Sequence, residues 1–319
     1  MKFISYNKVM IKILIEIPTW LGDTVMATPA IENLTYHFKD LQITIIGSFA
    51  SVEVLKNHPN VNNIFILDKR FFSAYKFAKN LGKFDQFFSF RSSLRSKIFK
   101  LFINSSQKYQ FSKTKYQKNH QVEKYNNFIN DCINNNLYPQ NLIIYQDGQT
   151  LINKKRKLVG INPGASYGSA KRWYPEEFAK VAEKLSDSYE IIIFGGSDEI
   201  NLASDIEKLL IEKGVKNYTN LAGNTTIKEL INRISSLDLF ITADSGPMHI
   251  AASFQVPTVA IFGPTNDNET SQWSLEKSII VKKNLDCQPC MKRTCPLKHH
   301  NCMSLINADD VLRAVESLH

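Results

Sequence analysis

Three short segments of the sequence combine glycine with side chains that can carry charge, and each follows a run of apolar residues. In the first, residues 18–24, Asp23 follows Gly22 just after such a run. A carboxylate in this kind of loop can act as a general base that takes a proton from an attacking hydroxyl. The alternative is that Asp23 only caps the helix that begins there.

The second segment, residues 162–173, is typical of a phosphate-binding loop. Gly164 and Gly168 permit close approach of the backbone, Ser166 offers a hydroxyl, and Lys171 supplies a positive charge. These groups can hydrogen-bond a phosphate and balance its charge. The alternative is an ordinary flexible loop with a surface lysine.

The third segment, residues 242–249, leads from an apolar stretch into a short predicted helix at 246–254. The backbone N–H groups at a helix N-terminus bind anions such as pyrophosphate, and Gly246 leaves them uncovered. Asp244 could accept a hydrogen bond from a sugar or nucleoside hydroxyl, or it could only cap the helix. Together, the three segments favour a site for a nucleoside diphosphate.

Four cysteines near the C-terminal end are a further candidate site. Cys287, Cys290, Cys295 and Cys302 lie within sixteen residues. The first spacing suits zinc, whereas the later spacings are irregular. A structural zinc site, reduced thiols and a local disulfide therefore stay open as interpretations, and no catalytic metal site is predicted.

Other common nucleotide-binding motifs are absent from the sequence. No segment matches Gly-x-x-x-x-Gly-Lys-Ser/Thr or Gly-x-Gly-x-x-Gly. Kinase, P-loop and simple dinucleotide-oxidoreductase functions therefore lose their usual support.

The elements that carry the first segment alternate between strand and helix. The pattern predicts strands at 11–17, 42–47 and 63–67, and a helix at 24–38. This order is typical of a parallel sheet covered by helices, which binds its ligands beyond the carboxyl ends of the strands. In residues 71–145, the spacing of the apolar residues shows no clear helix or strand periodicity.

The alternation starts again after the charge run 154–157, which marks the expected domain boundary. We therefore expect two α/β domains, 1–157 and 158–319, with a cleft between them. The second domain is predicted to hold strands at 158–162, 190–194, 238–242 and 258–262, and helices at 175–185, 199–213, 226–234, 246–254 and 308–318.

Composition limits the class of protein. Of the 319 residues, 43% are hydrophobic and 22% are charged, which excludes global disorder. No apolar stretch is long enough to cross a membrane, and residues 1–8 lack the apolar core of a signal peptide. We therefore expect a cytoplasmic protein.

The net charge of +9 is concentrated in one segment. Residues 69–118 hold thirteen Lys or Arg and one acid, Asp85. A segment this basic predicts an acidic partner, which could be nucleic acid, an anionic membrane surface or an anionic substrate. The alternative is a lysine-rich composition with no consequence for binding.

The sequence resembles the bacterial heptosyltransferases of glycosyltransferase family 9. Residues 15–30 resemble the amino-terminal signature of that family, and its later signatures are matched by 162–165 with 171–173, by 244–252 and by 262–265. The loop 287–302 is similar to the heptosyltransferase II branch. The resemblance covers most of the chain and is weakest over 69–150.

This resemblance implies a GT-B fold, in which two Rossmann-like α/β/α domains face each other across a cleft. The domain 1–157 would bind the acceptor and the domain 158–319 the donor. The implied reaction transfers L-glycero-D-manno-heptose from ADP-heptose to the inner core of lipopolysaccharide or lipooligosaccharide, with inversion and without a cofactor. The similarity to the heptosyltransferase II branch implies addition of the second heptose to the first. A heptosyltransferase I acting on Kdo is the alternative.

The resemblance also assigns roles to residues. Asp23 is the catalytic base on the family pattern, and Lys171 contacts the phosphates. We expect the donor site to be lined by Ser166, Tyr167, Asp244, Ser245, Gly246, Met248 and His249. Contacts with the acceptor are expected from Trp20, Gly22, Arg91 and Arg95.

The expected partners are the nucleotide sugar and a lipid-anchored, anionic saccharide. The basic segment 69–118 fits peripheral contact with the cytoplasmic face of the inner membrane. The protein is expected to be a monomer and to bind no nucleic acid. Two alternatives stay open, a nucleic-acid-binding protein that uses the basic segment and a GT-B epimerase that acts on a nucleotide sugar.

Overall fold

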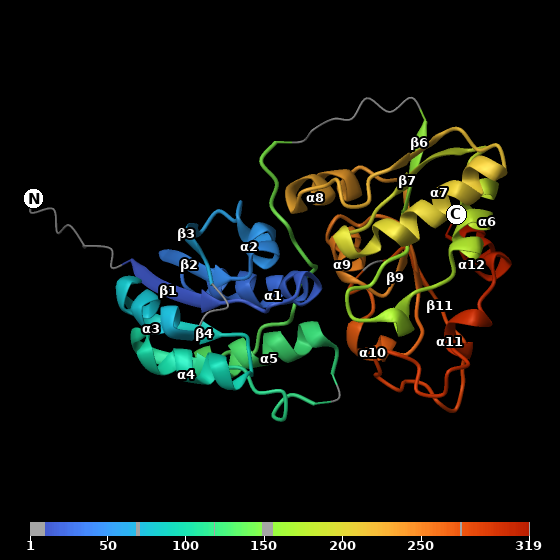
Figure 1. Cartoon of the computed structure of the whole chain (residues 1–319). Helices are drawn as coiled ribbons and strands as arrows, with labels where there is room; N and C mark the ends of the chain where they lie inside the picture. Colours follow the sequence, from blue (N-terminus) through green and yellow to red (C-terminus); the bar gives the residue numbers. More distant parts are fainter. Residues whose placement is uncertain (1–9, 68–70, 118, 149–155, 275, 319) are drawn as a thin grey trace, which may run out of the picture. The chain divides into compact units, whose positions relative to one another are not determined.

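The computed structural model divides the chain into two compact units, Met1–Asp147 and Gly148–His319. It describes residues 10–67, 71–117, 119–148, 156–274 and 276–318, with the backbone alone at 71–75 (Figure 1). The division lies ten residues before the boundary expected at 157. Residues 154 and 155 of the charge run that marked this boundary lie outside the described residues.

The first unit alternates strands and helices along its whole described length. Its elements are β1 (Ile11–Glu16), α1 (Leu21–His37), β2 (Leu41–Gly47), α2 (Phe49–Leu55), β3 (Val61–Ile66), α3 (Phe71–Asn80), β4 (Lys83–Ser89), α4 (Leu94–Phe102), β5 (Asn104–Gln110) and α5 (Gln121–Ile133).

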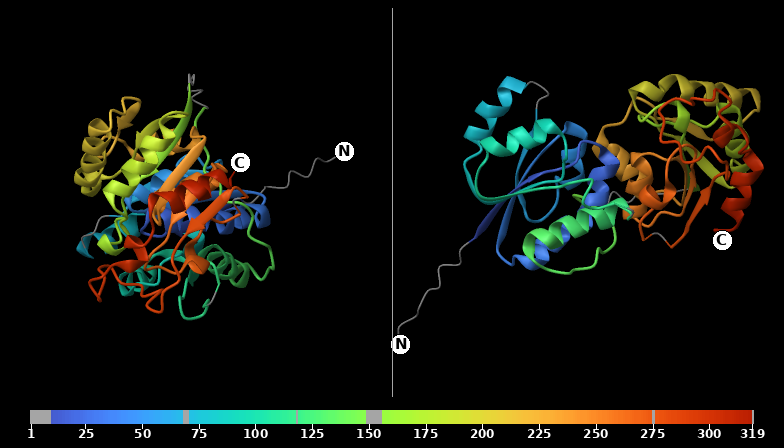
Figure 2. Two further views of the ribbon diagram at one scale, coloured as in Figure 1. Left: turned by 90° about the vertical axis from the view of Figure 1, so that its right-hand side faces the viewer. Right: turned by 90° about the horizontal axis from the view of Figure 1, so that it is seen from below.

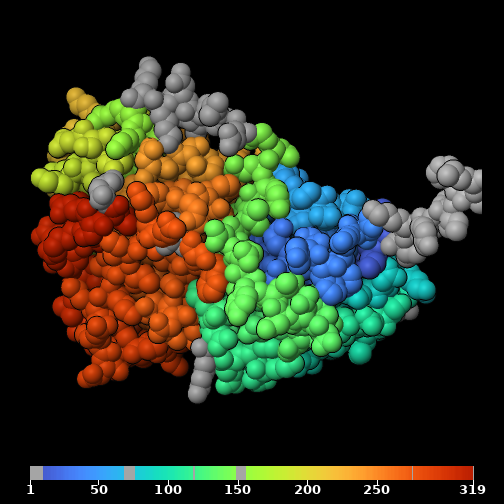
Figure 3. All heavy atoms as spheres, turned by 180° about the vertical axis from the view of Figure 1, so that it is seen from behind, coloured from blue at the N-terminus to red at the C-terminus, as the bar shows by residue number. Residues whose placement is uncertain are grey.

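The five strands form a parallel sheet in the order β3-β2-β1-β4-β5. The helices α1 and α5 pack side by side, as Figure 3 shows where the green of α5 meets the blue of α1. The helices α3 and α4 pack together on the other face of the sheet (Figure 2, right). Leu14 and Phe87 of the sheet meet Ala78 and Phe99 of these helices in one buried cluster. This doubly wound arrangement is the one that the alternation predicts.

The second unit repeats this plan. Its elements are β6 (Lys157–Asn162), η1 (Ser169–Lys171), α6 (Pro175–Leu185), β7 (Tyr189–Ile193), η2 (Ser197–Glu199), α7 (Ile200–Glu212), β8 (Tyr218–Asn220), α8 (Ile227–Ser235), β9 (Leu239–Ala243), α9 (Gly246–Ser253), β10 (Thr258–Ile261), α10 (Asp267–Thr270), β11 (Ser278–Val281), α11 (Asn301–Ser304) and α12 (Ala308–Glu316).

Its sheet has six parallel strands in the order β11-β10-β9-β6-β7-β8. One face packs against α6, α7 and α12 through a large apolar core that includes Phe178, Ile206 and Val311. In a second, smaller apolar cluster, Met248 of α9 packs with Ala260 and Phe262. Both units therefore have the expected α/β architecture.

Most predicted elements agree with the structure to within a few residues. The first helix begins at Leu21 rather than at residue 24. The unassigned region 71–145 holds five elements, from α3 to α5. The short strands β8 and β11 and the short helices α10 and α11 were not predicted.

Within the described residues, no helix is long and apolar enough to cross a membrane.

Candidate functional site

In the second sheet, the chain changes direction between β6 and β9. From β6 it runs outward through β7 to β8, and it then returns to the other side of β6 as β9. Open α/β sheets bind their ligands at such a reversal, beyond the carboxyl ends of the two strands. The predicted phosphate loop 162–173 follows β6, and the segment 242–249 follows β9. The fold therefore brings the two predicted segments together.

Lys171 and Asp244 meet at this point. The Nζ of Lys171 lies 2.5 Å from Oδ2 of Asp244, and it also donates a hydrogen bond to the main-chain oxygen of Asp244 at 3.3 Å. The hydroxyl of Thr265 donates to the same carboxylate oxygen at 2.5 Å. Asp244 is buried, with 4% of its surface exposed. The structure thus joins two predicted donor-site residues in one buried ion pair.

Asp244 does not cap the helix that follows it. The N-cap of α9 is Ser245, whose side chain makes no capping hydrogen bond. The capping alternative for Asp244 is therefore wrong.

Asn162 holds the ends of β6 and β9 in place. It lies opposite Thr242 in the parallel register. Its side-chain amide donates to the hydroxyls of Thr242 at 3.2 Å and of Ser245 at 2.9 Å. A further hydrogen bond from this amide reaches the main-chain oxygen of Gly164. Asn162 fixes the two segments relative to each other, a role that the sequence alone did not suggest.

The start of α9 attracts anions mainly through its helix dipole, which places partial positive charge there. Gly246 and Pro247 open this helix; Pro247 has no backbone N–H, and the N–H of Met248 donates to the main-chain oxygen of Ser245 at 3.1 Å. Met248 and His249 are buried within the helix. An anion at this end of α9 would meet the positive end of the dipole, with Lys171 close by.

Two cations lie close to the ring of Tyr167. The Nζ of Lys171 lies 4.9 Å from the centroid of its ring, and the guanidinium carbon of Arg293 lies 5.3 Å from it. The hydroxyl of Tyr167 donates to the main-chain oxygen of Met291 at 2.8 Å. The phosphate loop is therefore held against the cysteine-containing loop 287–302, and Arg293 adds a second positive charge beside Lys171. Ser166 is exposed.

Gly168 permits this close packing. A Cβ on Gly168 would lie 2.3 Å from the main-chain oxygen of Arg293, and the same oxygen accepts a hydrogen bond from the N–H of Ala170 at 3.0 Å. A side chain at Gly168 would push the two loops apart.

Glu199 is a further candidate site residue, which the sequence analysis missed. It follows β7, is 5% exposed, and accepts a hydrogen bond from the N–H of Gly196 at 2.7 Å through Oε2. Its Oε1 is buried and has no hydrogen-bond partner within the described part of the chain. A Cβ on Gly164 would lie 2.1 Å from Cγ of Glu199, so this side chain lies against the phosphate loop. An acid after the second strand of a Rossmann-like unit commonly accepts from ribose hydroxyls, a signal that could have identified Glu199.

The first sheet reverses direction between β1 and β4. Trp20 and Gly22 precede Asp23 on the segment that follows β1, and the indole of Trp20 is half exposed. The N-cap of α1 is Trp20, and Asp23 is the third residue of the helix. The interpretation of Asp23 as an N-cap is therefore wrong. Burial, followed by the negative charge of Asp23, raises the pKa of Tyr125 well above its usual value, so the Asp23 carboxylate lies close enough to Tyr125 to affect its ionisation.

A buried carboxylate occupies the reversal point of the first sheet. Glu16 ends β1, is 1% exposed and lies opposite Ser89 in the register of β1 and β4. Ser89 donates to Oε2 of Glu16 at 2.6 Å, and Ser96 also donates to this oxygen. The guanidinium of Arg91 lies 3.5 Å from Oε1 of Glu16. The predicted acceptor residue Arg91 is thus held by Glu16, which the sequence analysis did not single out. Arg95, on α4, is half-buried.

The four clustered cysteines line one small cavity of about 20 Å³, together with His299. All of them are free thiols, so no local disulfide is formed. Burial, followed by the neighbouring Cys290, Cys295 and Cys287, raises the pKa of Cys302 to about 11. Across the described residues, no three His, Cys, Asp or Glu side chains are arranged to hold a metal ion. The zinc interpretation gains no support from this geometry.

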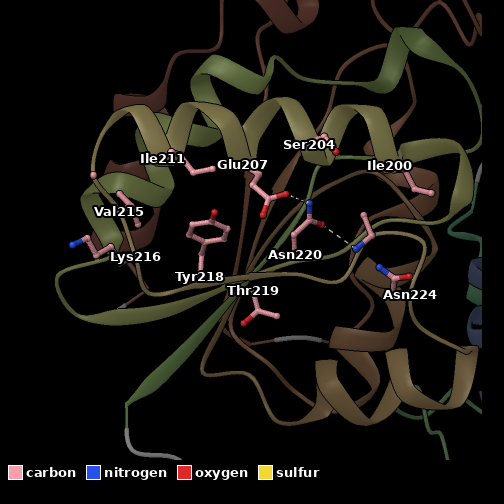
Figure 4. Close-up of a pocket in the computed structure, with 12 residues that line it drawn as sticks. Ile200, Ser204, Glu207, Ile211, Val215, Lys216, Tyr218, Thr219, Asn220 and Asn224 are labelled. Carbon is pink, nitrogen blue, oxygen red and sulfur yellow. Dashed lines mark hydrogen bonds between the residues drawn. The ribbon is translucent and has the colours of Figure 1, made fainter.

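A hollow of about 710 Å³ lies elsewhere on the second unit, between α7 and residues 214–224 (Figure 4). Within it, the amide of Asn220 donates to Glu207 at 2.8 Å and accepts from the N–H of Ala222 at 3.1 Å. Burial and the charge of Glu207 raise the pKa of Tyr218. These polar groups pair with one another along the edge strand β8, and none belongs to the predicted donor site.

Comparison with known proteins shows the family to which this chain is similar. Residues 89–301 match the family described as glycosyltransferase family 9 (heptosyltransferase). The chain is 45% identical to a lipooligosaccharide heptosyltransferase 2 of Campylobacter jejuni over 315 residues, which cover 96% of this chain and 98% of that protein.

Two solved structures have the same fold. Heptosyltransferase II of E. coli matches with a TM-score of 0.81 and 21% identity, and the match covers 97% of this chain and 98% of that one. E. coli heptosyltransferase WaaC with ADP matches with a TM-score of 0.77 and 12% identity over 97% of this chain and 100% of that one. These likenesses confirm the expected GT-B fold class. The family match and the Campylobacter relative together show that this chain belongs to glycosyltransferase family 9.

Proposed function

We propose that this chain is an inverting heptosyltransferase that moves L-glycero-D-manno-heptose from ADP-heptose to the inner core of lipooligosaccharide or lipopolysaccharide, adding the second heptose to the first. The observation that carries the proposal is the Lys171–Asp244 pair beside the N-terminus of α9, at the reversal point of the second sheet. The relative from Campylobacter jejuni, named for the second heptosyl transfer, supports this activity over heptosyltransferase I acting on Kdo.

The second unit binds the donor in this proposal. The diphosphate lies at the N-terminus of α9, where Lys171 and Arg293 add positive charge. The ribose hydroxyls donate to the buried Oε1 of Glu199, because a ligand donor would satisfy this otherwise unpaired atom. Ser166, Tyr167, Ser245, Gly246, Met248 and His249 remain the predicted lining.

The reaction is a single displacement. The acceptor hydroxyl oxygen attacks the anomeric carbon of the heptose while the bond between that carbon and the diphosphate oxygen breaks. Asp23 takes the proton of the hydroxyl, and ADP leaves with the bonding electron pair. Attack on the face opposite the leaving group inverts the configuration at the anomeric carbon.

The developing charge on ADP needs stabilisation. Fixed donors and cations already aimed at the leaving group lower the barrier without rearranging in the transition state. Lys171, Arg293 and the positive end of the α9 helix dipole can do this. We propose that these residues suffice without a metal ion, and that the enzyme requires no cofactor.

The first unit binds the lipid-anchored acceptor. Trp20, Gly22, Arg91 and Arg95 are the proposed contacts, and the basic segment 69–118 supports peripheral contact with the anionic cytoplasmic face of the inner membrane. We propose that the enzyme works there as a monomer. Membership of a glycosyltransferase family favours membrane contact over nucleic-acid binding as the use of the basic segment. It also favours glycosyl transfer over epimerisation of a nucleotide sugar.

The test is an assay with purified protein, ADP-heptose and lipooligosaccharide whose core carries either no heptose or one. Mass spectrometry should show addition of one heptose to the mono-heptosylated core only. Transfer to the heptose-free core would identify a heptosyltransferase I instead. Hydrolysis of the donor without transfer to either core would contradict the proposal.

A further inference from the structure

The helix α4 has apolar residues on both of its faces. Ser96, Phe99 and Ile103 point into the first unit and are 1–2% exposed, and the ring of Phe99 stacks on that of Phe77. On the opposite face, Leu94 is 73% exposed and Leu101 is 70% exposed. These two leucines are seven residues apart, so they lie on one side of the helix two turns apart, with the half-buried Ile98 between them.

This outward face departs from the usual pattern of a surface helix. The solvent side of such a helix is normally polar. On α4 the outward positions 94, 98 and 101 are apolar, and Phe102 beside them is 41% exposed. Leu94, Leu101 and Phe102 thus form an exposed apolar patch with the half-buried Ile98, and a patch of this kind indicates an interaction surface.

The surroundings of this face are cationic. Lys97 lies on the same side of α4 and is exposed, and Lys100 follows it one turn later. The exposed Lys76 and Lys79 belong to α3, which packs beside α4. The segment 69–118 has Asp85 as its one acid. Apolar side chains flanked by lysines are the composition of a helix that lies in the interface of an anionic bilayer.

The inner face of α4 connects this surface to the candidate acceptor site. Ser96 donates to the carboxylate of Glu16, at the reversal point of the first sheet. Arg91, a proposed acceptor contact, pairs with the same carboxylate. The inner side of α4 therefore contacts the edge of the sheet where the acceptor would bind. The outer side of α4 is exposed to solvent.

We propose that Leu94, Ile98 and Leu101 insert into the headgroup region of an anionic lipid bilayer, while the lysines of α3 and α4 bind its phosphates. This inference rests on the proposed function, because a lipid-anchored acceptor explains why the outward face of α4 lies near the acceptor site. Membrane binding itself is measured without any sugar transfer, so the two can fail separately.

The test is co-sedimentation of the full chain with vesicles of phosphatidylethanolamine and phosphatidylglycerol, and with vesicles of phosphatidylcholine. The wild type should bind the anionic vesicles and leave the neutral ones largely unbound. The double variant Leu94→Gln/Leu101→Gln keeps every charge and should bind the anionic vesicles about tenfold or more weakly, since it removes two inserting side chains. The matched control Ile211→Gln changes a residue of the second unit that is 60% exposed, and it should bind like the wild type.

A second readout reports insertion directly. Tryptophan fluorescence of Leu101→Trp should shift to the blue and be quenched by brominated lipids when anionic vesicles are added, whereas Ile211→Trp should add no such change to the wild-type signal. The double variant should retain wild-type ADP affinity and wild-type turnover on a water-soluble core oligosaccharide.

Three results would overturn the inference. The first is equal binding of the double variant and the wild type to anionic vesicles, and the second is no binding by either protein. The third is concentration-dependent self-association of the wild type that the double variant loses in analytical ultracentrifugation, because that result would assign the face to a second copy of the chain.

Discussion

The ammonium nitrogen of Lys171 lies 2.5 Å from a carboxylate oxygen of Asp244, and these two residues come from opposite sides of the reversal point in the second sheet. In the absence of a ligand, the positive charge of Lys171 and the negative charge of Asp244 compensate each other. A bound diphosphate would offer Lys171 a second anionic partner of higher charge. The same lysine can therefore stabilise the site before binding and the leaving group during transfer.

We first predict that Lys171→Ala weakens ADP binding by about ten- to a hundredfold, because a hydrogen bond to a charged group contributes about 1.5–3 kcal/mol. Isothermal titration calorimetry with ADP measures this directly. Lys208→Ala is the control, since Lys208 lies on the exposed face of α7 and pairs with Asp205. Equal ADP affinity in the two variants would remove Lys171 from the donor site.

The second prediction concerns stability. Glu16→Ala removes the acceptor shared by Ser89 and Ser96 and leaves Arg91 without its buried partner. The free energy of unfolding should fall by about 2–4 kcal/mol in urea titrations. Asp131→Ala breaks a largely exposed ion pair with Lys115 in the same unit and should cost less than about 1 kcal/mol. Similar losses in the two variants would show that the Glu16 network contributes no more than a surface pair.

The third prediction uses the raised pKa of Cys302. A thiol whose pKa is about 11 stays protonated at pH 8, and the thiolate is the form that iodoacetamide alkylates. Cys302 should therefore react more slowly at pH 8 than glutathione, and its rate should increase as the pH rises toward 11 for as long as the chain stays folded. Mass spectrometry of peptides after timed alkylation checks this. Rapid labelling of Cys302 at pH 8 would contradict it.

The fourth prediction is that heptosyl transfer continues in excess EDTA, because we propose that Lys171, Arg293 and the helix dipole of α9, rather than a metal ion, stabilise the leaving group. A loss of activity that Mg²⁺ restores would overturn the metal-independent mechanism. Unfolding in EDTA that only Zn²⁺ reverses would instead support a structural metal at the four clustered cysteines.

Much of the fold could be predicted because its signals are local. Strands such as β1 and β6 are dense in apolar residues, and Thr226 with Glu229 forms a capping box at the start of α8, where a helix was predicted. In the region 71–145, which showed no clear period, the strand β5 is built largely of polar residues, and the helix α4 is apolar on its outward face as well as its inward face. That face obscured the helix pattern, and it is also the surface that the proposed membrane contact uses.

Lys171 and Asp244, each within three residues of a glycine in a loop, were predicted from the sequence as site residues, and the structure brings them together. Glu16 and Glu199 were missed because their roles depend on partners far away in the sequence. Glu16 meets Ser89 and Ser96 only when β1 and β4 pair. Glu199 meets Gly164 only when the ends of β6 and β7 lie side by side.

The measurement that tests the account most directly is the turnover of Asp23→Asn. The substitution keeps the size of the side chain and removes its ability to take a proton. Asp23 is not the N-cap of α1, so the variant should fold with a melting temperature near that of the wild type and bind ADP normally. Its kcat for heptosyl transfer should fall by about 10²–10⁴, the usual contribution of a general base. A kcat within a few-fold of the wild type, at unchanged ADP affinity, would contradict the assignment of Asp23 as the catalytic base.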